Sequence, residues 1–563
     1  MDNFPSLRRG TSLAVLGLFA GLSLLLTFPL GIQMDRAVLG NLGDPLLIAW
    51  TLAWDVHQLF QDPLHLFEAN CFYPYPHVLA YSEHLFGDAL LVSPLLLVPK
   101  LAVLAANVLF LLSFALSGWG VYLLMRELSN DQGPAILAGL IFAFSPYRLG
   151  RLGHLHILST QWIPFIFLFL HRFTRSPNWK YGLLAGLFYI LQGLSSNHYA
   201  VFLGPVVLLW AAFFLVSQRS FWTWRNVLIS ATCGALALIF LLPFFMPYLD
   251  LRHTLGFTRF VGEAKMFSAQ GASYLSTSEF NRLYGVIARP FAASSFPFEK
   301  QLFPGLIATV LALTAVLRCP PQRRLLLWSY GAILVFAVLM TFGPRWTTLG
   351  KEMDSPYRLF FNYVPGWSGI RVPARMHMIT MLALSILAGL GATALRQNMG
   401  RMARKVFTCI LGALVLLESF SVPLPLVQVP PPAPVYRWLA AQPGKPVILE
   451  LPMPVKNEDR WKETAYVYAS IFHWKPLVNG YSGYFPPSYF SLCEVMQRFP
   501  DPSSLEAINK FRVTYVLWHS AQYDSLQKAR IITQLASTKE LISVVRFGED
   551  WVLTTPINLP AQR

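Results

Sequence analysis

Residues 12–32 read SLAVLGLFAGLSLLLTFPLGI, an uncharged run that follows Arg8 and Arg9. A bilayer is crossed by about 20 apolar residues, so we expect this run to be the first membrane helix. It lacks a small-residue cleavage site and is too long for a signal-peptide core, which favours an uncleaved helix. The two arginines place its N-terminus in the cytoplasm, because Lys and Arg are enriched on that side. The stretch Asn41-Leu42-Gly43-Asp44-Pro45 lies shortly beyond the helix.

The composition of the whole chain agrees with this start. Of 563 residues, 55% are hydrophobic and only 13% are charged, against about 25% charged in soluble proteins. The net charge of +16 fits basic residues in cytoplasmic loops. No aromatic and basic pattern indicates a nucleic-acid partner. We therefore predict a polytopic α-helical membrane protein.

About eleven apolar segments are candidates for transmembrane helices. They cover residues 12–32, 101–124, 134–144, 157–170, 181–194, 199–216, 227–248, 302–317, 325–342, 376–395 and 406–422. The predicted membrane domain is thus 1–422, with external loops at 34–85, 250–300 and 343–374. Two further apolar stretches do not cross: 45–60 is too polar, and we expect a helix at the outer interface, whereas 88–99 is too short, and we expect an interfacial or re-entrant helix. Pro45 suits a first helical position, which makes Asp44 the expected N-cap.

The composition changes after residue 422. Six prolines in 423–435 predict a stiff linker. The remainder, 436–563, contains no apolar run long enough to cross a membrane. Residues 446–451 and 513–518 are typical of buried strands, and 436–441 and 503–510 of helices. We expect a small α/β domain outside the membrane.

Ionisable residues gather in the segments predicted to be external. Carboxylates and arginines on one membrane face suit a reaction in which a hydroxyl loses a proton while a phosphate leaves. The candidate catalytic acids are Asp44, Glu83 and Asp88. The candidate substrate-binding residues are Arg371, Arg375, Arg148, Arg151, His84, His154 and His156.

Several stretches make the chain resemble the GT-C superfamily of integral-membrane glycosyltransferases. They are Gly43-Asp44-Pro45, Phe72-Tyr73-Pro74, Ala143-Phe144-Ser145-Pro146-Tyr147-Arg148, Val364-Pro365-Gly366-Trp367, Arg371-Val372-Pro373-Ala374-Arg375 and Val478-Asn479-Gly480-Tyr481-Ser482-Gly483. That superfamily includes protein mannosyltransferases, aminoarabinose transferases and oligosaccharyltransferases. The order of first span, external loop with an early Asp, surface helices, further spans and external C-terminal domain is similar along nearly the whole chain. The resemblance is greatest to a largely uncharacterised bacterial branch, which itself resembles transferases that depend on polyprenyl-phosphate sugars.

The resemblance implies a hexosyl- or pentosyltransferase of the bacterial cytoplasmic (inner) membrane. Its donor would be a polyprenyl-phosphate-linked sugar, and its acceptor a glycan, lipid or protein on the outer face. The family's first-loop aspartate corresponds to Asp44, as general base or acceptor-positioning residue. Some relatives have two adjacent acids there, whereas Gly43 and Pro45 flank Asp44, so a second acid must come from Glu83 or Asp88. No cofactor is predicted, and no motif supports a divalent metal.

Each candidate also has a simpler interpretation. Glu83, His84 and Asp88 could belong to a solvated loop and helix cap, and Arg371 and Arg375 could anchor a helix end at lipid head groups. His154 and His156 lack a third metal ligand nearby. Two other functions remain open for the whole chain: a flippase for lipid-linked glycans, which predicts charges inside spans, and a non-catalytic scaffold for envelope glycan assembly.

Overall fold

The computed structural model of the chain describes residues 9–217, 221–293, 295–348, 351–538 and 540–555, so Arg8 lies outside the described residues. The chain forms two compact units. The first comprises Met1–Gln33, Val108–Phe245 and Thr258–Pro425, and the second comprises Met34–Asn107, Met246–Phe257 and Leu426–Arg563. We call them the helical unit and the mixed unit.

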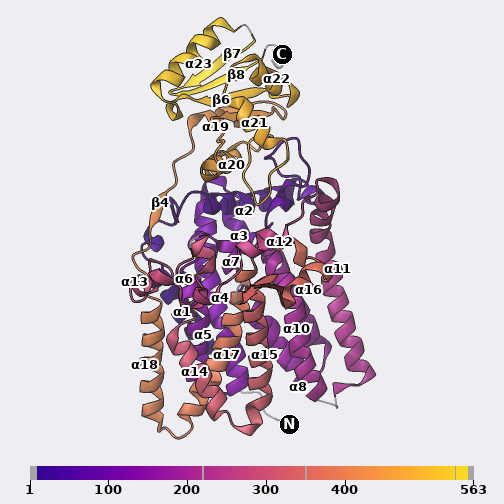
Figure 1. Cartoon of the computed structure of the whole chain (residues 1–563), viewed down its shortest axis with the longest axis vertical. Helices are drawn as coiled ribbons and strands as arrows, with labels where there is room; N and C mark the ends of the chain where they lie inside the picture. Colours follow the sequence, from indigo (N-terminus) through magenta and orange to yellow (C-terminus); the bar gives the residue numbers. More distant parts are fainter. Residues whose placement is uncertain (1–8, 218–220, 294, 349–350, 539, 556–563) are drawn as a thin grey trace. The chain divides into compact units, whose positions relative to one another are not determined.

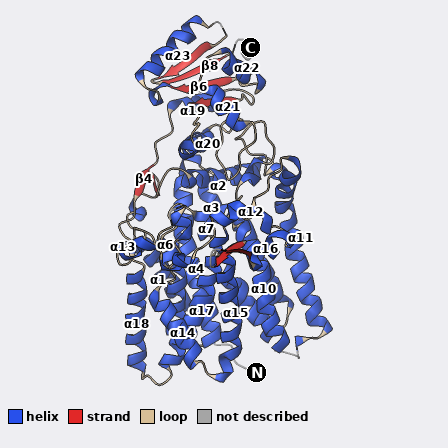
Figure 2. Cartoon of the chain, in the orientation of Figure 1, coloured by secondary structure: helices blue, strands red, loops and turns tan. Residues whose placement is uncertain are grey.

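Long apolar helices dominate the helical unit (Figures 1 and 2). The helices at the predicted spans are α1 (Arg9–Leu26), α4 (Ala102–Ser129), α5 (Gln132–Ala143), α8 (Ile163–Arg175), α9 (Trp179–Ser195), α10 (Asn197–Ser217), α11 (Trp224–Thr254), α14 (Leu306–Arg318), α15 (Arg324–Thr341), α17 (His377–Arg396) and α18 (Arg401–Glu418). Within the described residues, five helical stretches are long and apolar enough to cross a membrane: Pro99–Ser129, Asn197–Phe214, Trp224–Thr254, Pro321–Thr341 and Pro373–Arg396. A multi-pass membrane protein is therefore confirmed, and the count of eleven spans stays a prediction.

One predicted span differs in the structure. The run 157–170 does not form one helix: α7 (Leu155–Leu158) is a single turn, and α8 starts again at Ile163. Pro164 explains the restart, because proline fits the first turn of a helix but interrupts one that already runs through it. The remaining short elements of this unit are α6 (Pro146–Leu149), α12 (Val261–Met266), α13 (Gly285–Ala288), β2 (Arg345–Thr348), β3 (Lys351–Asp354) and α16 (Pro356–Tyr363).

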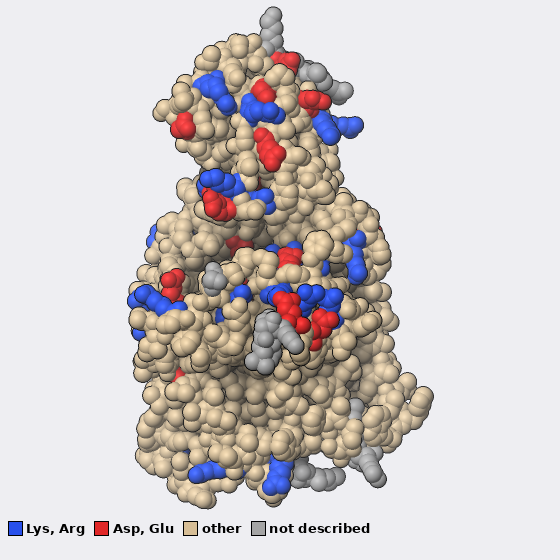
Figure 3. Space-filling model, viewed as in Figure 1, with Lys and Arg blue, Asp and Glu red and all other residues tan. Residues whose placement is uncertain are grey.

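Helix α17 is the centre of the helical unit. It packs against α14, α15 and α5, and nearly all of its residues are buried. At Gly391 a Cβ atom would stand 1.9 Å from the carbonyl oxygen of Leu311 in α14. Only glycine allows these two backbones to approach so closely, as in many membrane helix pairs. By contrast, much of α11 is exposed, and Figure 3 shows a broad band of the helical unit with few charged side chains, as expected for a lipid-facing surface.

The mixed unit begins with two helices from the first predicted loop, α2 (Asp44–Gln61) and α3 (Phe86–Leu96), which pack together. They confirm the helices expected at 45–60 and 88–99. The C-terminal part of the chain forms a four-stranded sheet of order β5-β6-β8-β7. In it β5 is parallel to β6, and the other neighbouring strands are antiparallel. Its strands are β5 (Ile448–Leu451), β6 (Tyr515–His519), β7 (Ile542–Phe547) and β8 (Asp550–Thr554).

The same part of the chain also forms helices, which are α19 (Pro434–Ala441), α20 (Glu463–Ala469), α21 (Tyr489–Met496), α22 (Pro502–Lys510) and α23 (Ser525–Ser537). The two strands and two helices predicted here are thereby confirmed. A separate ladder pairs β1 (Ala37–Leu39) with β4 (Leu426–Gln428), Val38 opposite Val427. Because β4 lies inside the proline-rich segment 423–435, part of that segment is a paired strand.

Candidate functional site

Asp44 lies in the first turn of α2. The N-cap is Gly43, and no described side chain caps the helix, so the expectation that Asp44 is the N-cap was off by one residue. Pro45 is compatible with either register, since the first turn of a helix needs no N–H from it. The Asp44 side chain is half-buried, and the Tyr481 hydroxyl donates to its Oδ1 atom across 3.5 Å.

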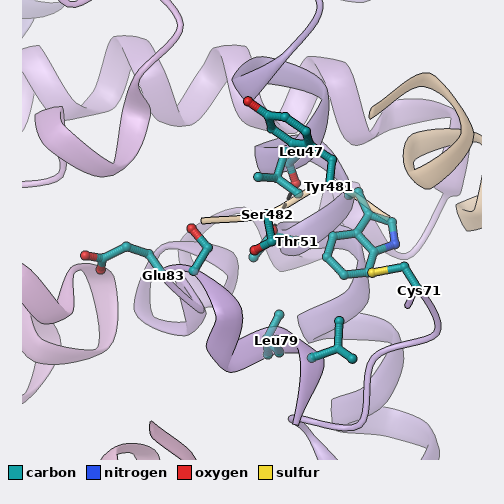
Figure 4. Close-up of a pocket in the computed structure, with 10 residues that line it drawn as sticks. Leu47, Thr51, Cys71, Leu79, Glu83, Tyr481 and Ser482 are labelled. Carbon is teal, nitrogen blue, oxygen red and sulfur yellow. Dashed lines mark hydrogen bonds between the residues drawn. The ribbon is translucent and has the colours of Figure 1, made fainter. Parts of the chain in front are cut away.

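A small pocket lies in the same unit. It is lined by Leu47, Trp50, Thr51, Cys71, Val78, Leu79, Ser82, Glu83, Tyr481 and Ser482. In Figure 4, Thr51 and Ser482 lie close together, while the Glu83 carboxylate points away from them. The pocket is much smaller than sites for drug-sized ligands, which measure roughly 300–1,000 Å³.

Asp88 and Asp55 of this unit are buried more deeply than Asp44. Asp88 lies in the first turn of α3 and is fully buried. His84 is also buried, and its Nδ1 atom accepts a hydrogen bond from the Phe86 N–H at 3.1 Å, which supports a structural role at the start of α3. Asp55 on α2 is fully buried, and neither of its carboxylate oxygens has a hydrogen-bond partner among the described residues. Burial, and then the neighbouring Asp88, raise the pKa of Asp55 well above its usual value.

The sequence did not single out Asp55 as a site residue. Its one signal was an acid in an otherwise apolar helix, and that signal is equally typical of a solvated helix face.

In the helical unit, a buried acid lies between two buried arginines. Glu299 accepts from Arg375 at Nη2 (2.5 Å) and at Nε (3.2 Å). Arg151 Nη1 lies 3.9 Å from the same carboxylate, and Arg151 Nη2 donates to the Glu299 carbonyl at 3.2 Å. All three side chains are at most 8% exposed. Burial alone would raise the pKa of Glu299, but Arg375 and Arg151 outweigh it and hold the pKa well below its usual value.

Three ionisable groups surround this triad. Arg371 is half-buried with its guanidinium over the Phe267 ring, at 5.1 Å from the centroid. His154 stacks on Phe298, and its ring centroid is 5.9 Å from that of His156. Burial, and then the positive charge of Arg375, lower the pKa of His156 well below its usual value. A neutral imidazole beside arginines can hydrogen-bond to an anion without adding charge.

Arg371 differs from its neighbours in what it binds. Among the described residues it takes part in no hydrogen bond and no ion pair, whereas Arg375 is bound to Glu299 and the nearby Arg259 forms an ion pair with Glu263 at 3.1 Å. Its positive charge is therefore not neutralised by a directly paired acid. A guanidinium in this state, partly shielded from water, is suited to a phosphate.

Arg148 is placed differently from the other predicted arginines. It is fully buried, and its two terminal nitrogens donate to Thr160 Oγ1 at 2.7 Å and to the carbonyl oxygens of Ser113 and Leu158 at 3.2 Å. Phe114 and Phe142 cover it. These contacts join α4 to the segment around α6 and α7, and they support a structural role for Arg148. Its predicted role in substrate binding stays a prediction.

No group of three or more His, Cys, Asp or Glu side chains forms a metal-binding cluster within the described part of the chain. Of the acids discussed so far, Asp44 lies beside a tyrosine, Glu83 lines the pocket, and Asp55 lies near Asp88.

A buried polar network stands behind Tyr481. Glu463 at the start of α20 is fully buried and accepts from the Tyr489 hydroxyl at 2.8 Å and from Asn479 Nδ2 at 3.4 Å. Burial raises the pKa of Glu463 to about 8, although the hydrogen bonds from Tyr489 and Asn479 lower it. This carboxyl group is therefore protonated in the folded protein over a pH range in which an exposed glutamate is ionised.

This shift predicts a pH-dependent stability. The unfolded chain loses the Glu463 proton near pH 4.5, whereas the folded protein keeps it until about pH 8, so between these values the folded state binds more protons and stability falls as pH rises. We expect the Glu463→Gln variant to lack this decline, which amounts to a few kcal/mol. The check is the apparent Tm of both proteins in lipid nanodiscs from pH 5 to 9. Glu458→Gln, an exposed acid nearby, is the control, and parallel curves for wild type and Glu463→Gln would contradict the assignment.

Comparisons with known proteins agree with the fold. Residues 95–246 match the family model described as dolichyl-phosphate-mannose-protein mannosyltransferase. No curated protein is significantly similar in sequence. The structure is similar to that of the arabinofuranosyltransferase AftD from Mycobacteria, with a TM-score of 0.62 and 14% identity, over 98% of this chain and 42% of that chain. The chain thus spans less than half the length of AftD.

Two other solved structures align along most of the chain with lower scores. ArnT from Cupriavidus metallidurans, bound to undecaprenyl phosphate, gives a TM-score of 0.48 at 11% identity and covers 99% of both chains. The archaeal oligosaccharyltransferase AglB from Archaeoglobus fulgidus, in complex with an inhibitory peptide and a dolichol-phosphate, gives 0.45 at 13% identity, over 99% of this chain and 76% of that chain. The resemblance to the GT-C superfamily of glycosyltransferases is confirmed by the family match and the AftD fold.

Proposed function

We propose that this protein is an inverting glycosyltransferase that moves a sugar from a polyprenyl-phosphate donor to an acceptor hydroxyl at the outer face of the cytoplasmic membrane. The acceptor oxygen forms a bond to the anomeric carbon while the bond from that carbon to the phosphate oxygen breaks. The hydroxyl proton passes to Asp44, and the lipid leaves with the phosphate. The N-terminus lies in the cytoplasm and the C-terminal part outside in this proposal.

Arg371 is the observation that carries the proposal. It offers donors that no described side chain uses, next to a buried triad of two arginines and one glutamate. The triad carries a net charge of +1, and it holds Arg375 two residues before α17 begins. A lipid phosphate would neutralise Arg371 and gain charge-assisted hydrogen bonds. The neutral His156 would add a hydrogen bond.

Asp44 is the base in this proposal for three reasons. It is a half-buried carboxylate near a pocket lined by hydroxyl side chains. Its tyrosine partner can hold the carboxylate in one orientation. By contrast, the buried Asp55 keeps its proton to a higher pH than an ordinary aspartate, and a protonated acid cannot act as a base.

The proposal is tested with the purified full-length protein in lipid nanodiscs and a panel of polyprenyl-phosphate-linked hexoses and pentoses. Release of polyprenyl phosphate, with or without a simple alcohol as acceptor, is followed by mass spectrometry. Turnover of at least one donor is the expected result. Movement of the lipid between leaflets without cleavage would favour the flippase, and neither cleavage nor movement would favour the scaffold.

Arg371→Gln is expected to weaken binding of undecaprenyl phosphate. Hydrogen bonds to charged groups contribute about 1.5–3 kcal/mol, which corresponds to a Kd raised roughly 10- to 150-fold. Binding is measured with undecaprenyl phosphate in nanodiscs by native mass spectrometry. Arg345→Gln is the matched control, because Arg345 is an exposed arginine of the same unit with surface ion pairs only. Equal affinities for the Arg371 variant and wild type would remove Arg371 from the phosphate site.

A further inference from the structure

Tyr481 and Ser482 belong to a loop, residues 478–483, that forms one wall of the pocket. The same loop brings the Tyr481 hydroxyl to Asp44. The position of this loop therefore determines both the shape of the pocket and the hydrogen-bond partner of the proposed base.

The loop is fixed from behind by the side chains of two helices. The Gly480 N–H donates to the Tyr489 hydroxyl at 3.1 Å, and that hydroxyl donates in turn to Glu463 at 2.8 Å. On the other side the Phe72 ring packs against Gly480, where a Cβ would come within about 2.6 Å of three ring atoms. The loop is thus held between Phe72 and the Tyr489–Glu463 pair.

The residue after Glu463 holds the segment that carries Asp44. The Thr464 hydroxyl oxygen lies 2.9 Å from the Leu42 carbonyl oxygen, two residues before Asp44, and 2.5 Å from the Trp461 carbonyl oxygen, so these two acceptors share its one proton. The side chain of Trp461 lies beside Gly43, 3.3 Å from where a Cβ would be. Two consecutive residues of α20 therefore fix both the Tyr481 loop and the entry to α2.

We infer that Glu463 and Thr464 are positioning residues, which set the geometry of the Asp44–Tyr481 pair and of the acceptor side of the pocket. This inference rests on the proposed function for its catalytic consequence. The structural part of the inference does not depend on that function. Removing the contacts of Glu463 should loosen the loop that carries Tyr481, and removing those of Thr464 should loosen the segment that carries Asp44. In this inference the C-terminal part influences the reaction through these contacts and does not supply a reacting group.

The test uses three variants of the full-length protein in nanodiscs. Thr464→Val removes the hydroxyl that contacts Leu42, and Tyr489→Phe removes the hydroxyl that bridges Glu463 and Gly480. Tyr468→Phe is the matched control, since it removes a hydroxyl from a largely buried tyrosine of α20 that no hydrogen bond connects to either segment among the described residues. Hydrogen exchange is followed by mass spectrometry in peptides covering 41–46 and 478–483.

We expect Thr464→Val to speed exchange in 41–46 and Tyr489→Phe to speed it in 478–483, each at least several-fold, with no change for Tyr468→Phe. With a donor that turns over, kcat should fall about tenfold in both variants, while the affinity for undecaprenyl phosphate stays that of wild type. Thr464→Ser, which keeps the hydroxyl, should restore most of the lost kcat.

Unchanged exchange in both segments would overturn the inference, as would a kcat reduced no more than in Tyr468→Phe. If Asp44→Asn proves fully active, the proposed role of Asp44 fails, but the exchange result still decides whether residues 463 and 464 position the two segments. If no donor turns over, the exchange rates alone support or overturn the positioning role.

Discussion

Replacing Asp44 by asparagine is expected to lower the rate of sugar transfer by about 10²–10⁴-fold, the range that general base catalysis contributes. Asparagine is nearly the same size and is well tolerated near a helix N-terminus, so α2 should still form. The Tyr481 hydroxyl can still donate to the amide oxygen. The loss therefore isolates the missing proton acceptor, and it should appear in kcat with little change in the affinity for undecaprenyl phosphate.

The control for this variant lies at the opposite end of the same helix. Asp62 follows the last residue of α2 and is half exposed, beside His65, so Asp62→Asn should retain wild-type turnover. Asp44→Glu is a useful second variant, because it keeps the base but moves it, and we expect an intermediate rate. Equal turnover by wild type and Asp44→Asn would exclude Asp44 as the base.

Glu299→Gln is expected to destabilise the protein by about 3–5 kcal/mol, the usual result of removing one partner from a buried ion pair. Glutamine keeps the shape of the side chain but leaves Arg151 and Arg375 as two buried positive charges with no acid between them. The measurement is the midpoint of unfolding in detergent with increasing SDS or temperature. Glu352→Gln, a surface acid that contacts Lys265 and Arg345, should cost at most about 1 kcal/mol.

A double variant separates charge from packing in the triad. Glu299→Gln combined with Arg375→Gln removes one acid and one base together, so its loss should be smaller than the sum of the two single losses. An additive double variant, or a single Glu299→Gln variant as stable as Glu352→Gln, would contradict the view that the triad is one electrostatic unit.

Helices and strands are determined largely by neighbouring residues, whereas the candidate site depends on residues far apart in the chain. Apolar length was enough to locate the helices, and strand-like runs were enough to locate β5 and β6, because both signals are carried by neighbouring residues. The exceptions were also local in origin. Pro164 divides the run 157–170, and Pro45 allows two registers for the start of α2, which the sequence alone does not distinguish.

The partners of the candidate site residues could not be predicted from the sequence. Arg375 and Arg151 were named in advance, but their common partner Glu299 is far from both along the chain, and nothing in its neighbours marks it. Glu299 changes the roles expected of the two arginines. Because Arg375 is bound to Glu299, Arg371 is the stronger candidate for binding a phosphate. The Tyr481 contact to Asp44 joins residues more than 400 positions apart and was not foreseen.

The ladder of β1 with β4 has a consequence for biogenesis. Val38 leaves the ribosome early, but its partner Val427 follows 389 residues later (427 − 38), which at about 5–20 residues per second is a delay of roughly 20–80 s. During that interval the apolar helices can enter the membrane, while the segment around Asp44 still lacks Thr464. A nascent chain stalled or truncated before residue 426 would therefore hold most of its membrane helices but no completed surroundings for its first-loop acid.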